Sequence, residues 1–308
     1  MTRFFQRLGT PMALLAIIAL FTALSPSAFG TASNLINITQ QMALLAMIAV
    51  GATFVLVLWE FDLSVGALAS WSGICVVTLL QAGATPMVAI GLALLSSTAF
   101  GVVSGLLVAR FAVPSFIATL ALGTVVAGFT FWLSGGATLF GGLPDGFRTL
   151  TRGTAFGLPR LTWWIAAGAL AAGLILTQTA FGRRLYAIGG NAEAARLAGV
   201  PMARDRTIAF AISATLAGLT GILLASRLGS AHPTGGDGFL LQAYAAVFLG
   251  TTAFRDGEAN IAGSIVGAAI IATLANGLTI LGTPSYVQDM LTGAIIILAV
   301  LVRRFAIR

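Results

Sequence analysis

Lysine is absent from this chain of 308 residues, and cysteine and histidine occur once each, as Cys75 and His232. One cysteine cannot form a disulfide framework, and one cysteine with one histidine cannot supply a zinc site or a Cys/His catalytic dyad. The P-loop of an ATPase needs a lysine for the β- and γ-phosphates. The absence of lysine therefore excludes an ATPase site of that type, and we expect no catalytic, metal or cofactor site in this chain.

Charged residues are also scarce, at 8% of the chain, whereas hydrophobic residues make up 58%. A soluble domain carries about 25% charged residues, and the mean hydropathy here is +1.00. The basic residues, all arginines, lie in short loops instead of a basic tract, so no nucleic-acid partner is expected. The composition predicts one all-α transmembrane domain over residues 1–308, with membrane lipid as its surroundings.

Apolar runs of about 20 residues, the length of a helix that crosses a bilayer, divide the chain into about ten predicted spans. The spans are 11–29, 38–59, 64–81, 86–109, 114–134, 161–179, 207–226, 240–253, 261–281 and 287–302. The eighth is short, and a re-entrant element is an alternative there. The first 30 residues also resemble a signal peptide; we favour an uncleaved first span, because the apolar stretch continues through Phe29.

The arginines in short loops predict the orientation, because positive residues are enriched on the cytoplasmic side. An N-terminus inside the cell leaves only four arginines outside: Arg148, Arg152, Arg160 and Arg227. Both termini are then cytoplasmic, residues 135–160 form the main external loop and residues 182–206 the main cytoplasmic loop.

The cytoplasmic loop carries the signals of one short helix. Asn191 is a good N-cap, Glu193 suits the positive N-terminal end, and Gly199 followed by Pro201 ends the helix. A helix of about two turns is unstable alone in water, so it must dock onto its own spans or onto a partner. The small exposed apolar face predicted for docking consists of Ala192, Ala195, Leu197 and Ala198. An ordinary capped connector is the alternative.

Two polar segments between spans point to a pathway through the membrane. Asp62 and Ser64, with Glu60 nearby, lie between the second and third spans. Charged groups at membrane depth are expensive and tend to face a cavity; the alternative is a short solvated turn in which Asp62 or Ser64 caps the third span. Residues 227–238, with His232, precede the eighth span. If spans two to five and seven to ten form an inverted repeat, the two segments occupy equivalent positions on opposite sides, as broken helices on a substrate path do.

Six stretches carry a further signal: Phe61–Gly66, Val113–Leu120, Gly182–Gly199, Pro233–Gly250, Asn276–Leu278 and Pro284–Gln288. In their order and spacing they resemble the permease subunits of ribose-type ABC sugar importers, in the superfamily that also contains the branched-chain amino-acid permeases. The resemblance extends over nearly the whole chain, from Asn34 to Arg303.

This resemblance implies a multi-pass protein of the bacterial inner membrane in which two copies form a pore. The pore would receive a monosaccharide or similar small polyol from a periplasmic binding protein and work by alternating access. Two cytoplasmic ATPase domains, which bind ATP and Mg²⁺, would drive it. The predicted loop helix resembles the family's coupling helix, which seats in a cleft of the ATPase. Its candidate contact residues are Asn191, Glu193, Ala194, Ala195, Arg196, Leu197, Ala198 and Gly199. The substrate pathway is assigned to Asp62, Ser64, Gln242 and Asn276.

Two departures from the family's sequence pattern mean that the resemblance does not identify the transported solute. The family usually has Gly-Gly-Ile before Asp-Leu-Ser, whereas this chain has Trp59-Glu60-Phe61, and the family's glycine-rich stretch after the eighth span is replaced by Thr251–Asn260. A branched-chain amino-acid permease is one alternative. A secondary carrier driven by an ion gradient is another, and it should have intramembrane carboxylates away from the span ends. A membrane-embedded enzyme is a third, for which one histidine without clustered carboxylates is a poor start.

Overall fold

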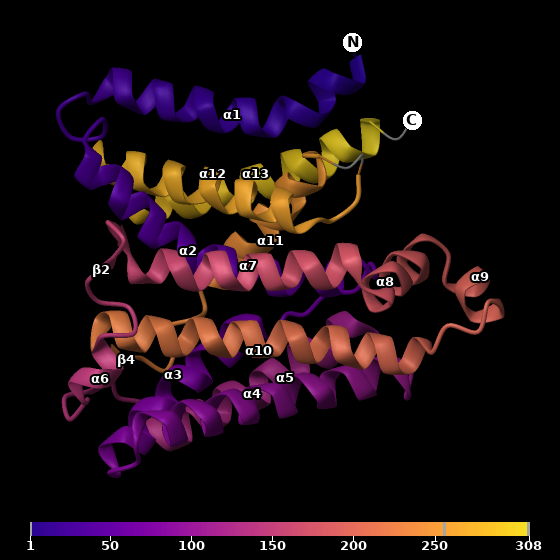
Figure 1. The fold of residues 1–308 in the computed structure, drawn as a ribbon, viewed down its shortest axis with the longest axis horizontal. Coiled ribbons are helices and arrows are strands. Elements are labelled where there is room, and N and C mark those ends of the chain that lie inside the picture. Colours follow the sequence, from indigo (N-terminus) through magenta and orange to yellow (C-terminus); the bar gives the residue numbers. More distant parts are fainter. Residues whose placement is uncertain (1, 255–256, 307–308) are drawn as a thin grey trace.

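Long helices run side by side in this protein and form one bundle (Figure 1). The computed structural model describes residues 2–254 and 257–306, and the side chains of residues 9–254, 257–295 and 297. The long helices are α1 (Thr2–Leu24), α2 (Ala32–Leu56), α3 (Val65–Gln81), α4 (Pro86–Ala109), α5 (Ser115–Ser134), α7 (Arg160–Gln178), α10 (Met202–Leu228), α11 (Phe239–Thr251), α12 (Ile261–Ile280) and α13 (Ser285–Ala306). Each predicted span overlaps one of these helices, although α2 begins six residues and α10 five residues earlier than predicted.

The first span differs from its prediction at its C-terminal end. The prediction placed this end at Phe29, whereas α1 stops at Leu24 and is followed by a turn. Pro26 explains the early end, because proline cannot donate to the helical ladder and disfavours helical backbone in the residue before it.

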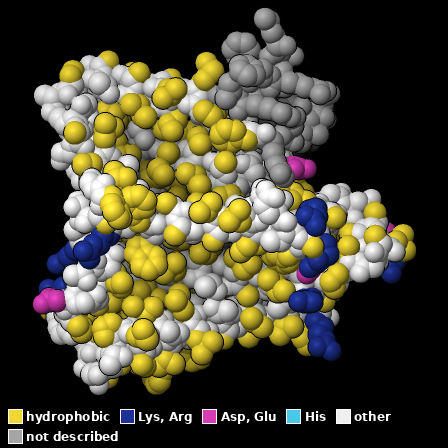
Figure 2. Space-filling view, viewed as in Figure 1, with side chains coloured by type: hydrophobic (Ala, Val, Ile, Leu, Met, Phe, Trp, Pro, Cys, Tyr) yellow, Lys and Arg dark blue, Asp and Glu magenta, His cyan; other side chains and the backbone are white. Residues whose placement is uncertain are grey.

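Six of the helices are long and apolar enough to cross a membrane: α2, α4, α5, α7, α10 and α12. Figure 2 shows hydrophobic side chains over the middle of one face, with arginine side chains gathered at its two ends. Because charged side chains avoid the hydrocarbon core, this distribution is typical of a membrane bundle, and the all-α membrane fold is confirmed. Helix α11 has 13 residues; at 1.5 Å per residue it is about 20 Å long, short of the roughly 30 Å core.

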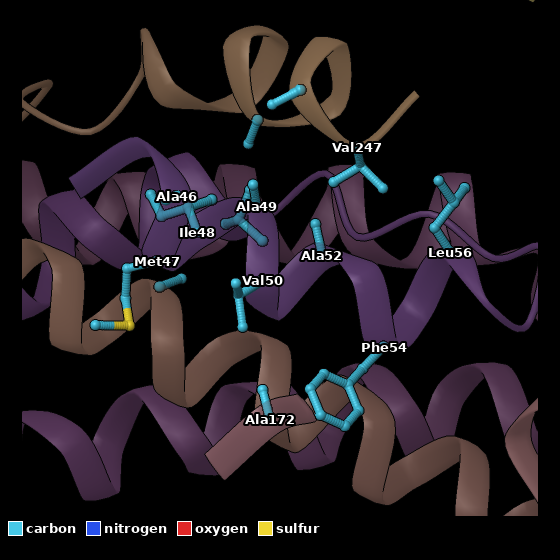
Figure 3. Close-up of a cluster of buried hydrophobic side chains, with 14 of the residues drawn as sticks. Ala46, Met47, Ile48, Ala49, Val50, Ala52, Phe54, Leu56, Ala172 and Val247 are labelled. Carbon is cyan, nitrogen blue, oxygen red and sulfur yellow. The ribbon is translucent and has the colours of Figure 1, made fainter. Parts of the chain in front are cut away.

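Helix α2 lies at the centre of the bundle. It begins after Thr31, whose side chain accepts a hydrogen bond from the backbone N–H of Asn34. Every residue from Ala43 to Leu58 is buried, because α2 packs against α7, α10, α11 and α12. Figure 3 shows its side chains in this core, with Ala172 of α7 and Val247 of α11. A helix that is apolar on all sides is typical of such an interior position.

The helices α2–α5 and α10–α13 make matching contacts. Helix α10 packs against α3 and α4, and α2 packs correspondingly against α11 and α12. Helix α3 contacts α5 as α11 contacts α13, and α2 and α10 contact each other. The two sets of four helices are therefore arranged equivalently on either side of the contact between α2 and α10.

Short elements lie at both ends of the bundle. At one end are the helix α6 (Asp145–Arg148) and the strands β1 (Leu139–Phe140), β2 (Thr154–Ala155), β3 (Leu158–Pro159) and β4 (Ser230–Ala231). Strand β1 pairs with β4, which ties residues 135–160 to the segment after α10. At the other end are α8 (Ala180–Gly190) and α9 (Ala192–Leu197), on the same side as the start of α1 and the end of α13 (Figure 1).

The contact between α3 and α10 requires glycine at position 221. A Cβ atom at Gly221 would lie 1.9 Å from the carbonyl oxygen of Ala69, so an alanine there must push the helices apart. Overpacking costs about 1–3 kcal/mol, and we expect Gly221→Ala to lower the midpoint of thermal unfolding in detergent. Gly173→Ala on α7 is the matched control, because no atom lies within 4 Å of the added Cβ. Equal midpoints for the two variants would contradict this account of the contact.

Candidate translocation pathway and coupling elements

Residues 57–64, the α2–α3 segment, are non-helical, and all of them except Trp59 are buried or half-buried. Trp59 adopts a left-handed backbone conformation with φ of 61°, and Asp62 and Ser64 are fully buried. The alternative of a solvated turn is therefore wrong for Asp62 and Ser64, although its capping position is met. Ser64 is the N-cap of α3, but its side chain makes no capping hydrogen bond; it donates to the Asp62 carboxylate.

Side chains of neighbouring helices take the place of helical hydrogen bonds along this segment. Three consecutive backbone N–H groups donate to hydroxyl oxygens: Phe61 to Ser115 Oγ (3.2 Å), Asp62 to the Tyr244 hydroxyl (2.6 Å) and Leu63 to Thr119 Oγ1 (3.0 Å). Irregular backbone at membrane depth is tolerated only where protein groups or a water-filled cavity satisfy it. Helices α5 and α11 therefore hold the α2–α3 segment in its broken conformation.

The Asp62 carboxylate connects the segment to α10. Its Oδ2 accepts a hydrogen bond from Ser213 Oγ at 2.8 Å, and its Oδ1 accepts one from the Ser64 backbone N–H at 3.1 Å and another from Ser64 Oγ. A buried charge is tolerated when its lone pairs are satisfied in this way. Both carboxylate oxygens are thus engaged within the chain in this conformation.

An aromatic cluster lies beside the segment. The ring centroids of Phe61 and Tyr244 are 5.6 Å apart, and Phe248 lies 6.3 Å from Phe61 and 6.4 Å from Tyr244. These separations are in the range of favourable ring contacts. Helix α11 therefore supplies both a hydroxyl and an apolar wall to the α2–α3 segment.

The second predicted polar segment was residues 227–238; its first two residues belong to α10, and the rest, residues 229–238, contacts the first turns of α3. The backbone N–H of Gly236 donates to Ser70 Oγ at 2.9 Å, and a Cβ atom at Gly66 would lie 3.0 Å from the Gly236 carbonyl oxygen. A cavity of about 150 Å³ lies between this segment, α3 and α10, and Ser70 and His232 are among its lining residues. Residues 229–238 thus lie beside the N-terminal turns of α3, which directly follow the α2–α3 segment.

The four pathway candidates lie at different depths along the bundle. Asp62 and Ser64 lie together, whereas Asn276 accepts a hydrogen bond from Asn34 Nδ2 at 2.9 Å, near the opposite end of α2. Gln242 is half-buried and lines a small cavity of about 20 Å³ between α11, α12 and α13, two residues before Tyr244 on α11. Ser213, which donates to Asp62, lies beside Gly51 of α2, and Gly51 is about 26 Å from Asn34 at 1.5 Å per residue. Most of the length of α2 therefore separates Asp62 from Asn276.

Sequence reasoning missed the hydroxyl partners Ser115, Thr119, Ser213 and Tyr244. A serine or threonine in an apolar helix ordinarily bonds to the carbonyl four residues earlier, as Thr119 also does to Ser115 here. A hydroxyl inside an apolar run carries no signal that it serves another segment, and only the fold brings these four groups to residues 61–64.

Two short helices occupy the loop predicted to be cytoplasmic, residues 182–206, whereas one was predicted. Helix α8 precedes the predicted helix, which is α9. As predicted, the Asn191 side chain caps α9 by accepting a hydrogen bond from the backbone N–H of Ala194 at 2.9 Å, and Gly199 follows the helix with φ of 76°. The Arg196 guanidinium donates to Glu193 at 3.1 Å, and this hydrogen bond lowers the pKa of the Glu193 carboxyl.

The predicted apolar face of α9 is only partly exposed. Ala195 is buried, which corrects the prediction that it is exposed, and Ala192 is half-buried. Val200 donates its backbone N–H to the Ala195 carbonyl, so the chain after α9 folds back over this side. Ala198 and Leu197 are exposed, and Leu197 has 75% of its surface accessible. The surface that α9 offers to a partner therefore centres on Leu197.

An ion pair fixes α8 to the start of α10. Arg184 donates Nε and Nη2 to the two carboxylate oxygens of Asp205, at 2.5 Å and 3.0 Å, and the Asp205 side chain is fully buried. Two parallel hydrogen bonds make this the geometrically specific form of the arginine–carboxylate pair, and they raise the pKa of Arg184. Both helices that flank α9 are thus joined to each other.

No group of three or more histidine, cysteine, aspartate or glutamate side chains that could hold a metal ion occurs in the part of the chain that the structure describes. Cys75 is half-buried on α3, and His232 accepts a hydrogen bond from the Thr234 backbone N–H in the 229–238 segment.

Comparison with known proteins agrees with a transport role for these elements. The profile of the family described as "Branched-chain amino acid transport system / permease component" matches residues 34–300. The ribose import permease protein RbsC of Escherichia coli (strain K12) is 38% identical over 94% of this chain and 91% of its own. The RbsC of Bacillus subtilis (strain 168) is 37% identical over 97% and 93%. The L-arabinose ABC transporter permease protein AraH of Azospirillum brasilense is 33% identical over 96% and 87%. The chain therefore belongs to this family of transport permeases, and it is a permease component of the membrane and not an enzyme.

Proposed function

We propose that this chain is the membrane-spanning subunit of an ABC importer that carries a monosaccharide or similar small polyol across the bacterial inner membrane. The observation that carries this proposal is the similarity, over nearly the full length of both chains, to permeases named for ribose and for L-arabinose. The interrupted helices support it, because a buried polar break between helices is a common feature of substrate paths.

In this proposal the chain crosses the membrane about ten times, with both termini in the cytoplasm. The placement of α8, α9, the start of α1 and the end of α13 at one end of the bundle supports that orientation (Figure 1). The matching contacts of α2–α5 and α10–α13 support an inverted repeat, in which the α2–α3 segment and residues 229–238 are equivalent. Residues 135–160 then face outward, towards a periplasmic solute-binding protein.

The substrate path passes the four polar candidates in turn. Asn276 belongs to its outer part, Gln242 to its middle, and Asp62 and Ser64 to its inner part. Since both Asp62 oxygens are already bonded, transport by alternating access requires these bonds to rearrange when the pore opens to the other side. A second copy of the chain completes the pore.

Helix α9 with its flanking residues is the contact for the ATPase subunit, which binds the ATP and Mg²⁺. The residues concerned are Asn191, Glu193, Ala194, Ala195, Arg196, Leu197, Ala198 and Gly199. Leu197 carries the exposed apolar contact, and Ala195 supports α9 from its buried side.

Purification in mild detergent tests the subunit assignment. The tagged chain, expressed with its ATPase and solute-binding subunits, should retain the ATPase subunit and show ATP hydrolysis that the isolated chain lacks. Recovery of no ATPase subunit would count against an ABC importer and favour an ion-coupled secondary carrier.

The solute is best identified on the cognate solute-binding protein. We expect its thermal unfolding midpoint to rise with a pentose or a related sugar, because mass action stabilises the liganded form. If the midpoint rose with branched-chain amino acids and not with sugars or polyols, the proposed solute would be an amino acid. The assignment to an ABC importer would still stand.

A further inference from the structure

The α2–α3 segment is in direct backbone contact with α8. A Cβ atom at Gly189 would lie 1.9 Å from the Val57 carbonyl oxygen and 3.5 Å from the Leu58 Cα. This approach is possible only for glycine, and it leaves no flexible side chain between the two backbones. A displacement of α8 must therefore displace the first residues of the α2–α3 segment.

A charged pair makes a second contact at the same place. Arg206, on the first turns of α10, has its Nη2 atom 3.9 Å from Glu60 Oε1, and the two side chains are only 24% and 17% exposed. The Nε atom of Arg206 is buried and has no hydrogen-bond partner among the described residues. A charged pair at this separation is an ion pair without a hydrogen bond, so a small movement can convert it into a hydrogen-bonded pair and satisfy the buried donor.

Helix α10 reaches the same segment again two turns further on. Ser213 follows Arg206 by seven residues, so both side chains lie on one face of α10, about 10 Å apart. Arg206 contacts Glu60, and Ser213 donates to Asp62. Asp205, next to Arg206, is the buried partner of Arg184 on α8. The start of α10 is thus joined to α8 on one side and to both carboxylates of the α2–α3 segment on the other.

We propose that Glu60 and Arg206 are a positioning pair that transmits movement of the α8–α9 unit to Asp62 and so couples ATP hydrolysis to opening of the substrate path. The pair acts through the segment and does not contact the solute. This role rests on the proposed function, since it presupposes an ATPase subunit at α9. In this role, movement imposed by the ATPase subunit reaches the α2–α3 segment through the start of α10 and through Gly189, and not through α9 alone.

The test uses the complete transporter in liposomes, with its ATPase subunit and its solute-binding protein, and measures solute uptake and ATP hydrolysis on the same vesicles. Glu60→Gln and Arg206→Gln should each retain ATP hydrolysis within about twofold, while the ATP hydrolysed per solute imported rises by roughly fivefold or more, the lower end of typical couplings between sites. The double variant Glu60→Arg with Arg206→Glu restores opposite charges and should recover part of the wild-type ratio.

Arg110→Gln is the matched control. Arg110 is an exposed arginine at the same end of the bundle, at the C-cap of α4, and its loss should leave the ratio at the wild-type value. A wild-type ratio in Glu60→Gln would overturn the proposed coupling role. The same conclusion would follow if Glu60→Gln lost uptake together with ATPase binding and thermal stability, because the pair would then serve only to hold the fold. Failure of the wild-type complex to couple uptake to ATP would instead refute the proposed function.

Discussion

Replacing Leu197 by aspartate should separate this chain from its ATPase subunit. Leu197 is 75% exposed on α9 and is the large apolar side chain that this helix presents. A carboxylate in an apolar cleft loses its hydration without gaining a partner, and we expect at least a roughly 100-fold weaker association, about 2.8 kcal/mol. Quantifying the ATPase subunit that co-purifies in mild detergent measures this directly, and ATP-dependent uptake should disappear with it.

Phe156→Asp provides the control for an added surface charge. Phe156 is 94% exposed and lies in the loop between β2 and β3, at the opposite end of the bundle from α9. This variant should retain the ATPase subunit. If the Leu197→Asp variant retained the ATPase subunit as well as the wild type does, α9 would not be part of the contact with that subunit.

Replacing Asp62 by alanine should have the largest effect on the fold and should abolish uptake. The Asp62 carboxylate accepts hydrogen bonds from the backbone N–H and hydroxyl of Ser64 and from the hydroxyl of Ser213, all buried. Each donor left without an acceptor costs about 1–3 kcal/mol. We therefore expect a clear fall in the midpoint of thermal unfolding in detergent, and an α2–α3 segment that is no longer held against α10.

Two milder variants separate these effects. Asp62→Asn preserves an acceptor oxygen and the side-chain shape, so it should retain more stability than Asp62→Ala. Ser213→Ala removes only the bond to α10, so it should reduce uptake more than it reduces stability. An unfolding midpoint of Asp62→Ala equal to that of the wild type would show that the carboxylate does not hold the segment.

The positions of the long helices were predictable because the bilayer sets their length. Apolar runs near 20 residues translate directly into helices, and the helix ends missed by the prediction have local causes, as at Pro26. The cap of α9 was predictable for the same kind of reason, since Asn191 and Gly199 act within their own few residues.

The polar contacts could not be predicted, because they depend on how distant helices meet. Gly182, Gly189 and Gly190 made the sequence of α8 look like a loop, yet Gly189 permits the close contact with Val57. The hydroxyls of Ser213 and Tyr244 lie in apolar helices 151 and 182 residues from Asp62 along the chain. The sequence pattern identified Asp62 as a candidate, and only the fold identified what holds it.

Transport by the purified components tests the central claim most directly. The experiment uses liposomes that contain this chain and its ATPase subunit. ATP is supplied on the side of the membrane that carries the ATPase subunit, and the solute-binding protein on the opposite side. The transporter should then move a radiolabelled pentose or related sugar across the membrane, towards the side that carries the ATPase subunit. Uptake should require both the ATPase subunit and the binding protein. Uptake by this chain alone, driven by an imposed ion gradient and independent of ATP, would contradict the account.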